Sequence, residues 1–286
     1  QYPIIRVFGT IGWIVAGIFI GQLGLSSSSA IFTVSAVVSL LLGIYSFTLP
    51  YTPAEGKSAV FSKRDLFKVD AFKLFKDRNF AVYMICAVIV FIPAAAYNSF
   101  TSNFLGSLGF EKVGSIMTIG QMFEVVFMIL VPFFLVRLGV KYMALIGILA
   151  WALRLYFFAF GGTLDMTTLI ILGIAIHGIC VDFFMITATI YVQKAAPKEI
   201  KAQAQSLFVV LTAGIGSFVG SLLAGQLYNS TITEGASSMQ QWQTFWLIPA
   251  VIATLIAVFF LVAFKQEGKS KSAQVPLKPV SEKRLS

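Results

Sequence analysis

The chain alternates between long apolar stretches and polar connections along nearly its whole length. An apolar stretch of about 20 residues is long enough to cross a bilayer as a helix. The stretches that reach this length lie near residues 4–22, 30–50, 79–104, 113–136, 142–161, 167–193, 203–228 and 243–264. The pattern therefore predicts eight transmembrane helices and an all-α membrane protein.

The composition agrees with this pattern and excludes a soluble protein. Apolar residues make up 58% of the sequence and charged residues only 12%. The charged fraction is about half of the roughly 25% that is typical of soluble domains. A water-soluble surface cannot be built from so few charges, and a wholly disordered chain is excluded for the same reason.

The basic residues are concentrated in a few connections. Eighteen of the 21 lysines and arginines lie in residues 57–78, 137–141, 194–201 and 265–284. Lysine and arginine accumulate in cytoplasmic loops, and successive spans alternate in direction. All four segments then fall on the cytoplasmic side, and the outward connections contain only Lys112 among the basic residues. The net charge of +9 therefore indicates membrane orientation, with a cytoplasmic C-terminus, and not nucleic-acid binding.

The longest connection divides the predicted spans unequally. Residues 1–50 hold the first two spans, and residues 79–264 hold the other six. The loop between them, residues 51–78, contains alternating apolar and lysine side chains at 67–76, which predicts a short helix in the membrane interface. Residues 265–286 are rich in lysine, serine and proline, so we predict a disordered cytoplasmic tail.

Ionisable side chains inside spans are candidate functional residues, because a charge at the bilayer centre costs roughly 2.5–3.5 kcal/mol on insertion scales. The ionisable ones are Arg6, Glu124, Arg154, His177 and Asp182. Polar or aromatic side chains in the same spans are Thr10, Trp13, Asn98 and Gln121. The hypothesis is that several of these share a wet crevice near the middle of the membrane.

The first helix carries Arg6, Thr10 and Trp13 on one face. A cation, a hydroxyl and an indole on one stripe suit a polar ring compound. Equally, the arginine can extend to the interface while the indole faces lipid. Asn98, which follows Pro93 in the third predicted span, is either a ligand beside a helix break or a hydrogen bond between helices.

The fourth predicted span carries Gln121 and Glu124 as i, i+3 neighbours on one face. An amide beside a carboxylate offers donors and acceptors together. The Glu124 carboxyl is also a candidate proton carrier. A structural hydrogen bond between helices is the alternative, but a buried glutamate is costly enough that we favour a functional role.

His177 and Asp182 lie five residues apart, which is about 140° around a helix. They should therefore face different environments. Asp182 is predicted to pair with Arg154, because a lone buried charge is costlier than a paired one, or to take part in proton coupling. His177 either takes up a proton or serves as a simple hydrogen-bonding group.

Other features indicate packing. Cys86 and Cys180 sit in apolar runs without metal-ligand spacing, so we interpret them as packing residues. The seventh predicted span contains four glycines, and Gly216 and Gly220 form a GxxxG pair typical of close helix contact. The sequence contains no metal cluster and no convincing Ser/His/Asp spacing, so we expect neither an enzyme nor a bound metal or cofactor.

Six spans after a long cytoplasmic loop resemble the plan of the major facilitator superfamily, and Arg137-Leu-Gly-Val-Lys141 resembles a loop motif of that superfamily. The likeness to one branch is more specific. The segments that resemble the bacterial nucleoside:proton symporter family are IRVFGTIGW (5–13), GQMFEVVFM (120–128), HGICVDFF (177–184), IYVQKAAP (190–197) and KAQAQSLF (201–208). On the twelve-helix plan these spans would be the fifth to the twelfth, and the first four would be missing.

The resemblance implies roles for individual residues. The family's nucleoside-site positions are matched by Arg6, Thr10, Asn98, Gln121 and Glu124. Trp13 stands at an aromatic position, and Asp182 matches a carboxylate expected to matter for transport. Departures from the family pattern are Ala95 in place of Gln, His177 in place of Tyr and Val181 in place of Phe. These departures bear on base selectivity more than on the nucleoside class.

We therefore expect a monomeric secondary transporter that imports nucleosides with protons across the bacterial inner membrane by alternating access. A neutral nucleoside needs amides, a carboxylate, one arginine and a stacking ring. Phosphorylated substrates are disfavoured, because Arg6 and Arg154 are the only permanent cations predicted within spans. The alternatives are a transporter for another polar solute such as a sugar, or, in a different class, a non-transporting receptor or enzyme.

Overall fold

A computed structural model describes residues 2–25, 28–51, 70–233 and 238–265, with side chains described from residue 7 onward within these ranges. Every regular element in this part of the chain is helical, as the apolar pattern predicts. The elements are α1 (Tyr2–Gln22), α2 (Ala30–Ser46), η2 (Asp70–Lys76), α3 (Arg78–Ser107), α4 (Val113–Thr163), α5 (Thr167–Ala175), α6 (His177–Val181), η3 (Asp182–Ile186), α7 (Thr187–Ala195), η4 (Lys198–Ile200), α8 (Lys201–Val209), η5 (Val210–Gly216), α9 (Ser217–Thr231) and α10 (Met239–Ala263).

The number of clear spans is smaller than the predicted eight. Within the described residues, four helices are long and apolar enough to cross a membrane: Arg78–Ser107, Val113–Thr163, Lys198–Thr231 and Met239–Ala263. A fifth is obtained if the bent pair Thr167–Ala175 and His177–Ala195 counts as one span. Before the long connection, the apolar helical stretches with described side chains are shorter: Val7–Gln22, which is part of the 21-residue α1, and Ala30–Ser46.

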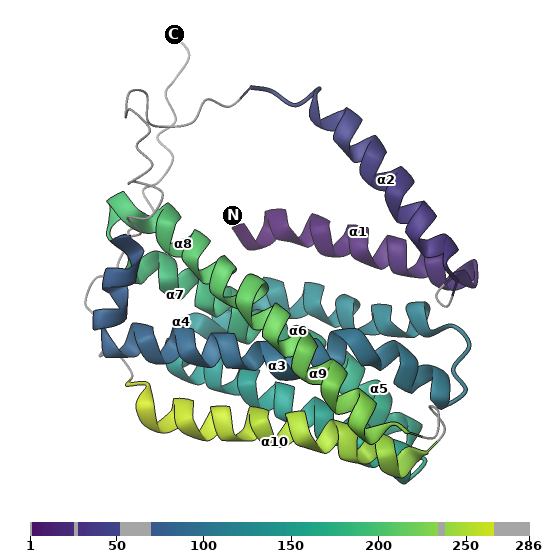
Figure 1. Cartoon of the computed structure of the whole chain (residues 1–286). Helices are drawn as coiled ribbons and strands as arrows, with labels where there is room; N and C mark the ends of the chain where they lie inside the picture. The colour runs from purple at the N-terminus through teal and green to yellow at the C-terminus, as the bar shows by residue number, and fades with distance from the viewer. Residues whose placement is uncertain (1, 26–27, 52–69, 234–237, 266–286) are drawn as a thin grey trace.

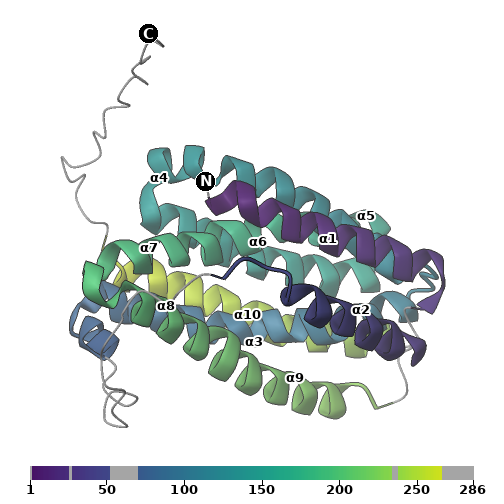
Figure 2. The same ribbon diagram turned by 90° about the horizontal axis from the view of Figure 1, so that it is seen from above.

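Helix α4 covers two of the predicted spans. It has 51 residues and contains a break at Gly139, whose φ of 72° and ψ of 175° are not helical. Glu124, before the break, and Arg154, after it, both contact the imidazole of His177. In a straight helix these two residues would stand about 45 Å apart. Helix α4 therefore folds back on itself, and its arms are residues 113–138 and 140–163 (Figure 2).

Gly139→Ala is expected to destabilise the protein by about 1–3 kcal/mol, because this φ/ψ region is nearly restricted to glycine. The measurement is the thermal unfolding midpoint in detergent or nanodiscs. The matched control is Gly106→Ala, since Gly106 is helical and an added Cβ would meet nothing within 4 Å in the described part of the chain. Alanine is favoured over glycine inside a helix, so the control midpoint should stay or rise. Equal changes in both variants would contradict this account of the break.

The sixth predicted span is also interrupted. Helices α5 and α6 meet at Ile176 with a bend of 40°. Helix α6 begins at His177, and the π-helix η3 follows it from Asp182. Single turns of π-helix are frequent at functional sites. The break places the one histidine of the chain at a helix start inside the bundle.

Two polar contacts fix the ends of the helical bundle that follows the long connection. Asp77 caps α3, because its carboxylate accepts from the Phe80 N–H at 2.8 Å. The Asn79 side chain donates to the Lys265 carbonyl and accepts from the Lys265 N–H, both at 3.0 Å. These bonds tie the start of α3 to the end of α10. The division into two helical units itself stays a prediction.

The core of this bundle is aromatic. Phe104 of α3 and Phe158 of α4 pack with Trp246 of α10, with ring centroids 5.2 to 5.5 Å apart. Near the other end, Tyr83 stacks on Phe184, and its hydroxyl donates to the Phe184 carbonyl at 3.0 Å. Cys86 and Cys180 are free and fully buried in the same core, as expected of packing residues.

Helix α1 lies along α4, and α2 stands farther from the bundle (Figure 1). The α1–α4 contact is close: a Cβ added to Gly17 would lie 2.7 Å from the Thr118 side chain, and one added to Gly21 would lie 2.5 Å from that of Ser115. Helix α2 has no buried residue. The packing of α1 on α4 sets the spacing of the cleft described below.

The GxxxG pair in the predicted seventh span has the expected packing role. A Cβ on Gly220 would approach the Phe91 carbonyl oxygen at 2.6 Å, and one on Gly216 would approach the Phe91 side chain at 3.0 Å. Both glycines therefore let η5 and α9 lie against α3. Gly214 and Gly225 differ, because an added Cβ would meet no atom of the described residues within 4 Å. The packing interpretation is wrong for these two.

The loop and tail are described only in part. Of the predicted interfacial helix, residues 67–69 lie outside the described residues, and 70–76 form the 3₁₀-helix η2. Ala71 is fully buried, and Phe72 and Lys73 are exposed. Residues 52–66 of the connection and 266–286 of the predicted tail also lie outside the described residues.

Candidate functional site

A cleft of about 1210 Å³ opens between α1 and α2 on one side and α3, α4 and α6 on the other. Ligand pockets usually measure roughly 300–1,000 Å³, so this one has room for a small organic molecule. Polar and aromatic side chains from all these helices face it: Thr10, Trp13, Ser35, Ser39, Tyr97, Asn98, Ser102, Thr118, Gln121, Glu124 and His177.

The cleft brings together six of the seven side chains predicted to bind substrate: Thr10, Trp13, Asn98, Gln121, Glu124 and His177. The seventh, Arg6, belongs to α1, but its side chain lies outside the described part of the chain. Arg154 and Asp182 are fully buried and do not line the cleft.

The lining side chains differ in exposure. Thr10, Gln121, Glu124 and His177 are buried at its floor, where each is less than a tenth exposed. Trp13 and Asn98 are open to the cleft, and Trp13 is 66% exposed. Hydrogen-bonding groups therefore lie at the bottom of the cleft, and an indole lies near its mouth.

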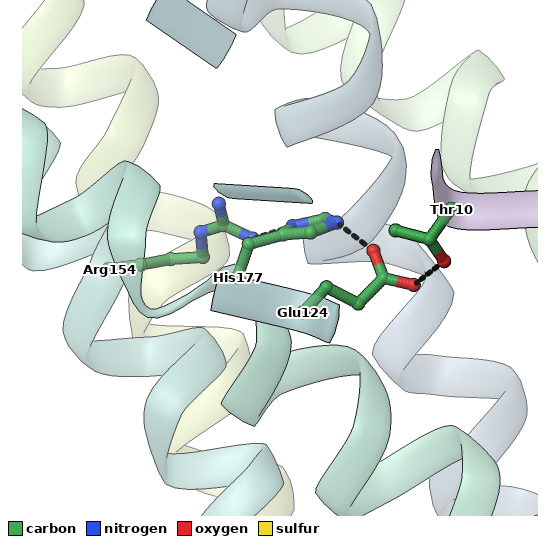
Figure 3. A network of polar contacts seen from close by, with 4 residues as sticks. All are labelled: Thr10, Glu124, Arg154 and His177. Atoms are coloured by element: carbon green, nitrogen blue, oxygen red, sulfur yellow. Dashed lines mark hydrogen bonds and ion pairs between the residues drawn. The ribbon is translucent and has the colours of Figure 1, made fainter. Parts of the chain in front are cut away.

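Four of the predicted polar residues form a chain of contacts across the floor (Figure 3). The Thr10 hydroxyl donates to Glu124 Oε1 at 3.4 Å. The other oxygen of that carboxylate lies 3.6 Å from His177 Nε2. His177 Nδ1 in turn lies 2.9 Å from the Arg154 guanidinium. The chain links α1 to both arms of α4 through the first residue of α6.

Arg154 occupies an aromatic and backbone niche behind the cleft. Its guanidinium carbon lies 3.5 Å from the centre of the Tyr97 ring and 5.0 Å from that of Trp151. Its Nε donates to the Gly173 carbonyl at 3.2 Å. Tyr97 also stacks on His177, with centroids 5.7 Å apart. Cation–π and hydrogen-bonding contacts thus offset part of the cost of burying this charge.

The contact between Arg154 and His177 is absent from the predictions, which pair Arg154 with Asp182. No local spacing in the sequence signals it, because the two residues approach only after α5 and α6 fold back along α4. The ion pair between Arg154 and Asp182 stays a prediction, as does a role for Asp182 in proton coupling. Asp182 is the first residue of the π-helix η3.

Pro93 does not open the cleft in the predicted way. Helix α3 continues through Pro93 to Ser107, and Pro93 is buried. Asn98 nevertheless lines the cleft, together with its neighbour Tyr97. The space beside Asn98 comes from the separation of α1 and α2 from α3, and not from a broken helix.

Gln121 offers an acceptor on the cleft floor. Its Oε1 atom is buried and has no hydrogen-bond partner among the described residues. A buried amide oxygen without a partner costs about 1–3 kcal/mol. An N–H or O–H group of a bound ligand would satisfy it, so the floor is adapted to a ligand that donates hydrogen bonds.

Glycines allow the close approach that builds the floor. A Cβ on Gly178 would lie 2.7 Å from Glu124 Cα, and one on Gly120 would lie 3.0 Å from His177 Cβ. The backbones of α4 and α6 can therefore touch beside the two ionisable side chains. Neither contact is predictable, because nothing in a single sequence shows which backbone an isolated glycine will meet.

The sequence of the chain matches a known protein family. The family described as Nucleoside H+ symporter matches residues 1–269. The chain is 35% identical to the xanthosine permease of Escherichia coli over 278 residues, which cover 92% of the chain and 65% of the permease. It is 34% identical to the putative nucleoside transporter YegT of the same organism over 285 residues, 96% of the chain and 67% of that protein.

A solved structure shows the same fold. The crystal structure of the nucleoside transporter NupG superposes with a TM-score of 0.77 at 32% identity, over 93% of the chain and 68% of that structure. Its D323A mutant gives a TM-score of 0.81 over 92% of the chain and 68% of the structure. The chain thus spans about two thirds of the length of its relatives. It is a helical membrane protein of the major facilitator fold, not an enzyme, and it belongs to the Nucleoside H+ symporter family.

Proposed function

We propose that this protein imports nucleosides together with protons across the bacterial inner membrane by alternating access. The observation that carries the proposal is the cleft, where polar side chains of α1 meet those of α3, α4 and α6. A transporter of this fold class binds its substrate between two helical halves that rock around it. The membership of the family and the permease relatives favour a nucleoside over other polar solutes.

The roles of the lining residues follow from their chemistry. Gln121, Asn98 and Glu124 bind the hydroxyl and amide groups of the nucleoside, because amides and a carboxylate supply both donors and acceptors. Thr10 and Arg6, both in α1, also bind the nucleoside. Trp13 stacks on the base near the cleft mouth, where its ring is exposed. His177 contributes its ring nitrogen Nε2, which lies 3.6 Å from the Glu124 carboxylate.

A carboxyl carries the coupled proton in this proposal. Glu124 is the stronger candidate, because it lines the cleft and faces hydrogen-bonding groups of both helical units. Asp182 is fully buried behind the cleft and is the alternative. Coupling requires that proton and nucleoside bind better together than separately.

We also propose that the chain crosses the membrane eight times as a monomer. The two arms of α4 would each make one crossing and the bent α5–α7 segment another. Helices α1, α2 and α3, the α8–α9 segment and α10 would make one crossing each. This arrangement keeps the basic segments and the C-terminus on the cytoplasmic side. Single cysteines introduced at Lys141 and Lys112 should be labelled by an impermeant maleimide from the inside and the outside, respectively.

The decisive experiment is counterflow in proteoliposomes that contain the complete reading frame holding this sequence. Labelled uridine should exchange into vesicles preloaded with unlabelled uridine or adenosine, and an inward proton gradient should drive its accumulation. Glucose and maltose in excess should not compete. Competition by a sugar and not by nucleosides would establish the alternative substrate class, and absence of any counterflow would exclude a transporter.

A further inference from the structure

We propose that Arg154 is a positioning residue that acts through His177: it holds the imidazole in the form with its proton on Nε2, so that the cleft floor presents a hydrogen-bond donor beside Glu124. The tautomer follows from the contacts alone. Its consequence for transport rests on the proposed function.

The hydrogen bond between Arg154 and His177 can have only one direction. A guanidinium has N–H donors and no acceptor, and it stays charged in proteins. The Arg154 nitrogen lies 2.9 Å from His177 Nδ1. Nδ1 must therefore accept, and it carries no proton. A neutral imidazole with an unprotonated Nδ1 carries its proton on Nε2.

The other edge of the imidazole ring faces a carboxylate. His177 Nε2 faces Glu124 Oε2 at 3.6 Å, so the N–H points at an acceptor. This distance is longer than an ordinary N–H···O hydrogen bond. An acceptor atom of a ligand can therefore take the N–H while the carboxylate accepts from a neighbouring ligand donor. The floor is complementary to a ligand that carries an acceptor next to a donor, as the edge of a nucleobase does.

The surroundings of the imidazole ring prevent it from turning over. Tyr97 stacks on the His177 ring at 5.7 Å with the planes 27° apart, and the Arg154 guanidinium lies over the same Tyr97 ring. A ring flip would put a C–H group against the guanidinium. Double protonation would set the Nδ1–H donor against the N–H donors of Arg154. While this contact is kept, the transported proton is held by a carboxyl and not by His177.

Nitrogen NMR tests the tautomer directly, because the sequence contains a single histidine. The protein is labelled with ¹⁵N-histidine, purified without a histidine tag and placed in nanodiscs at pH 7.5. Any histidine elsewhere in the reading frame is removed from the spectrum by subtraction of the His177→Gln sample. We expect one unprotonated nitrogen, assigned to Nδ1, and one protonated nitrogen, Nε2. A proton on Nδ1, or on both nitrogens, overturns the proposal.

Variants of Arg154 test whether this residue sets the tautomer. Arg154→Lys keeps a donor-only cation and should keep the signals distinct. Arg154→Met removes the donors and should move both signals toward the average of exchanging tautomers. The control is Tyr156→Phe, which removes a hydrogen bond to Thr254 from the same helix arm and should leave the spectrum unchanged. If the spectrum of Arg154→Met is the same as that of the wild-type protein, the proposal is overturned. If Arg154→Met does not fold, the tautomer seen in the spectrum of the wild-type protein decides.

Transport of uridine tests whether the two residues act as a unit. We expect Arg154→Met and His177→Gln each to raise KM about tenfold, which is at the upper end of the usual effect of losing one hydrogen bond between neutral groups. Residues that act through one another are not additive, so the double variant should also show about tenfold. If the double variant instead raises KM about a hundredfold, which is the product of the two single effects, the residues act independently and the proposal is overturned. If no form transports nucleosides but the spectra are as expected, the proposed function fails and the tautomer assignment stands.

Discussion

Glu124→Gln is expected to abolish proton-driven nucleoside accumulation and to leave a folded protein. Glutamine has nearly the same shape and can still bond to Thr10 and His177, which contact the two carboxylate oxygens in the wild type. An amide cannot take up and release a proton in this role. The initial rate of uptake under an inward proton gradient should fall about 100-fold or more, because a charge-assisted contact and the coupling are lost together.

Two further variants identify the source of this effect. Glu111→Gln makes the same chemical change at an exposed position before α4 and should transport as the wild type does. Asp182→Asn tests the other candidate carboxyl, which is buried behind the cleft. If Glu124→Gln still accumulates uridine against a gradient while Asp182→Asn does not, Asp182 carries the proton and the role proposed for Glu124 is wrong.

The lining of the cleft is largely predictable from the sequence for an energetic reason. Polar side chains in apolar spans are costly, so the few that occur are conspicuous, and most of them gather at one cleft. The helical period also predicts which side chains face the same way. The five-residue spacing of His177 and Asp182 predicts different environments, and in the structure His177 lines the cleft whereas Asp182 does not.

The contact between Arg154 and His177 is not predictable in the same way. It depends on the break at Ile176 and on the fold-back of α4 at Gly139, neither of which has a unique local signature. An apolar run of 27 residues near 167–193 fits a single straight span equally well. A buried cation is expected to pair with a carboxylate, which leads to Asp182, and that pairing stays a prediction. The fold also places the Tyr97 and Trp151 rings and the Gly173 carbonyl against the guanidinium, and the sequence carries no signal for these contacts.

The role of individual glycines also emerges only in three dimensions. The GxxxG pattern correctly indicates that Gly216 and Gly220 meet α3, because small residues four apart form a groove on one helix face. The same pattern in Gly17 and Gly21 brings α1 onto α4. Gly178 belongs to no such pattern. Its lack of a Cβ nevertheless allows the backbone of α6 to contact the backbone of α4 at Glu124, on the cleft floor.

Gly178→Ala is therefore expected to eliminate nucleoside uptake. The added Cβ would lie 2.7 Å from Glu124 Cα, 2.8 Å from Glu124 N and 2.8 Å from the Phe123 carbonyl oxygen. All three are backbone atoms, so no side-chain rotation can relieve the clash. Helix α6 must move away from α4, at a cost of about 1–3 kcal/mol in unfolding free energy by comparison with other overpacked sites. The same movement carries His177, the preceding residue, away from Glu124.

The measurements are uridine counterflow and the thermal unfolding midpoint, made on the same preparation. Gly214→Ala and Gly225→Ala are matched controls, because an added Cβ at either position would meet no described atom within 4 Å. Both controls should transport as the wild type does, and their unfolding midpoints should stay or rise. Wild-type counterflow by Gly178→Ala would mean that the floor tolerates a shift of α6, and the close packing of α4 and α6 would then not be needed to hold His177 beside the carboxylate.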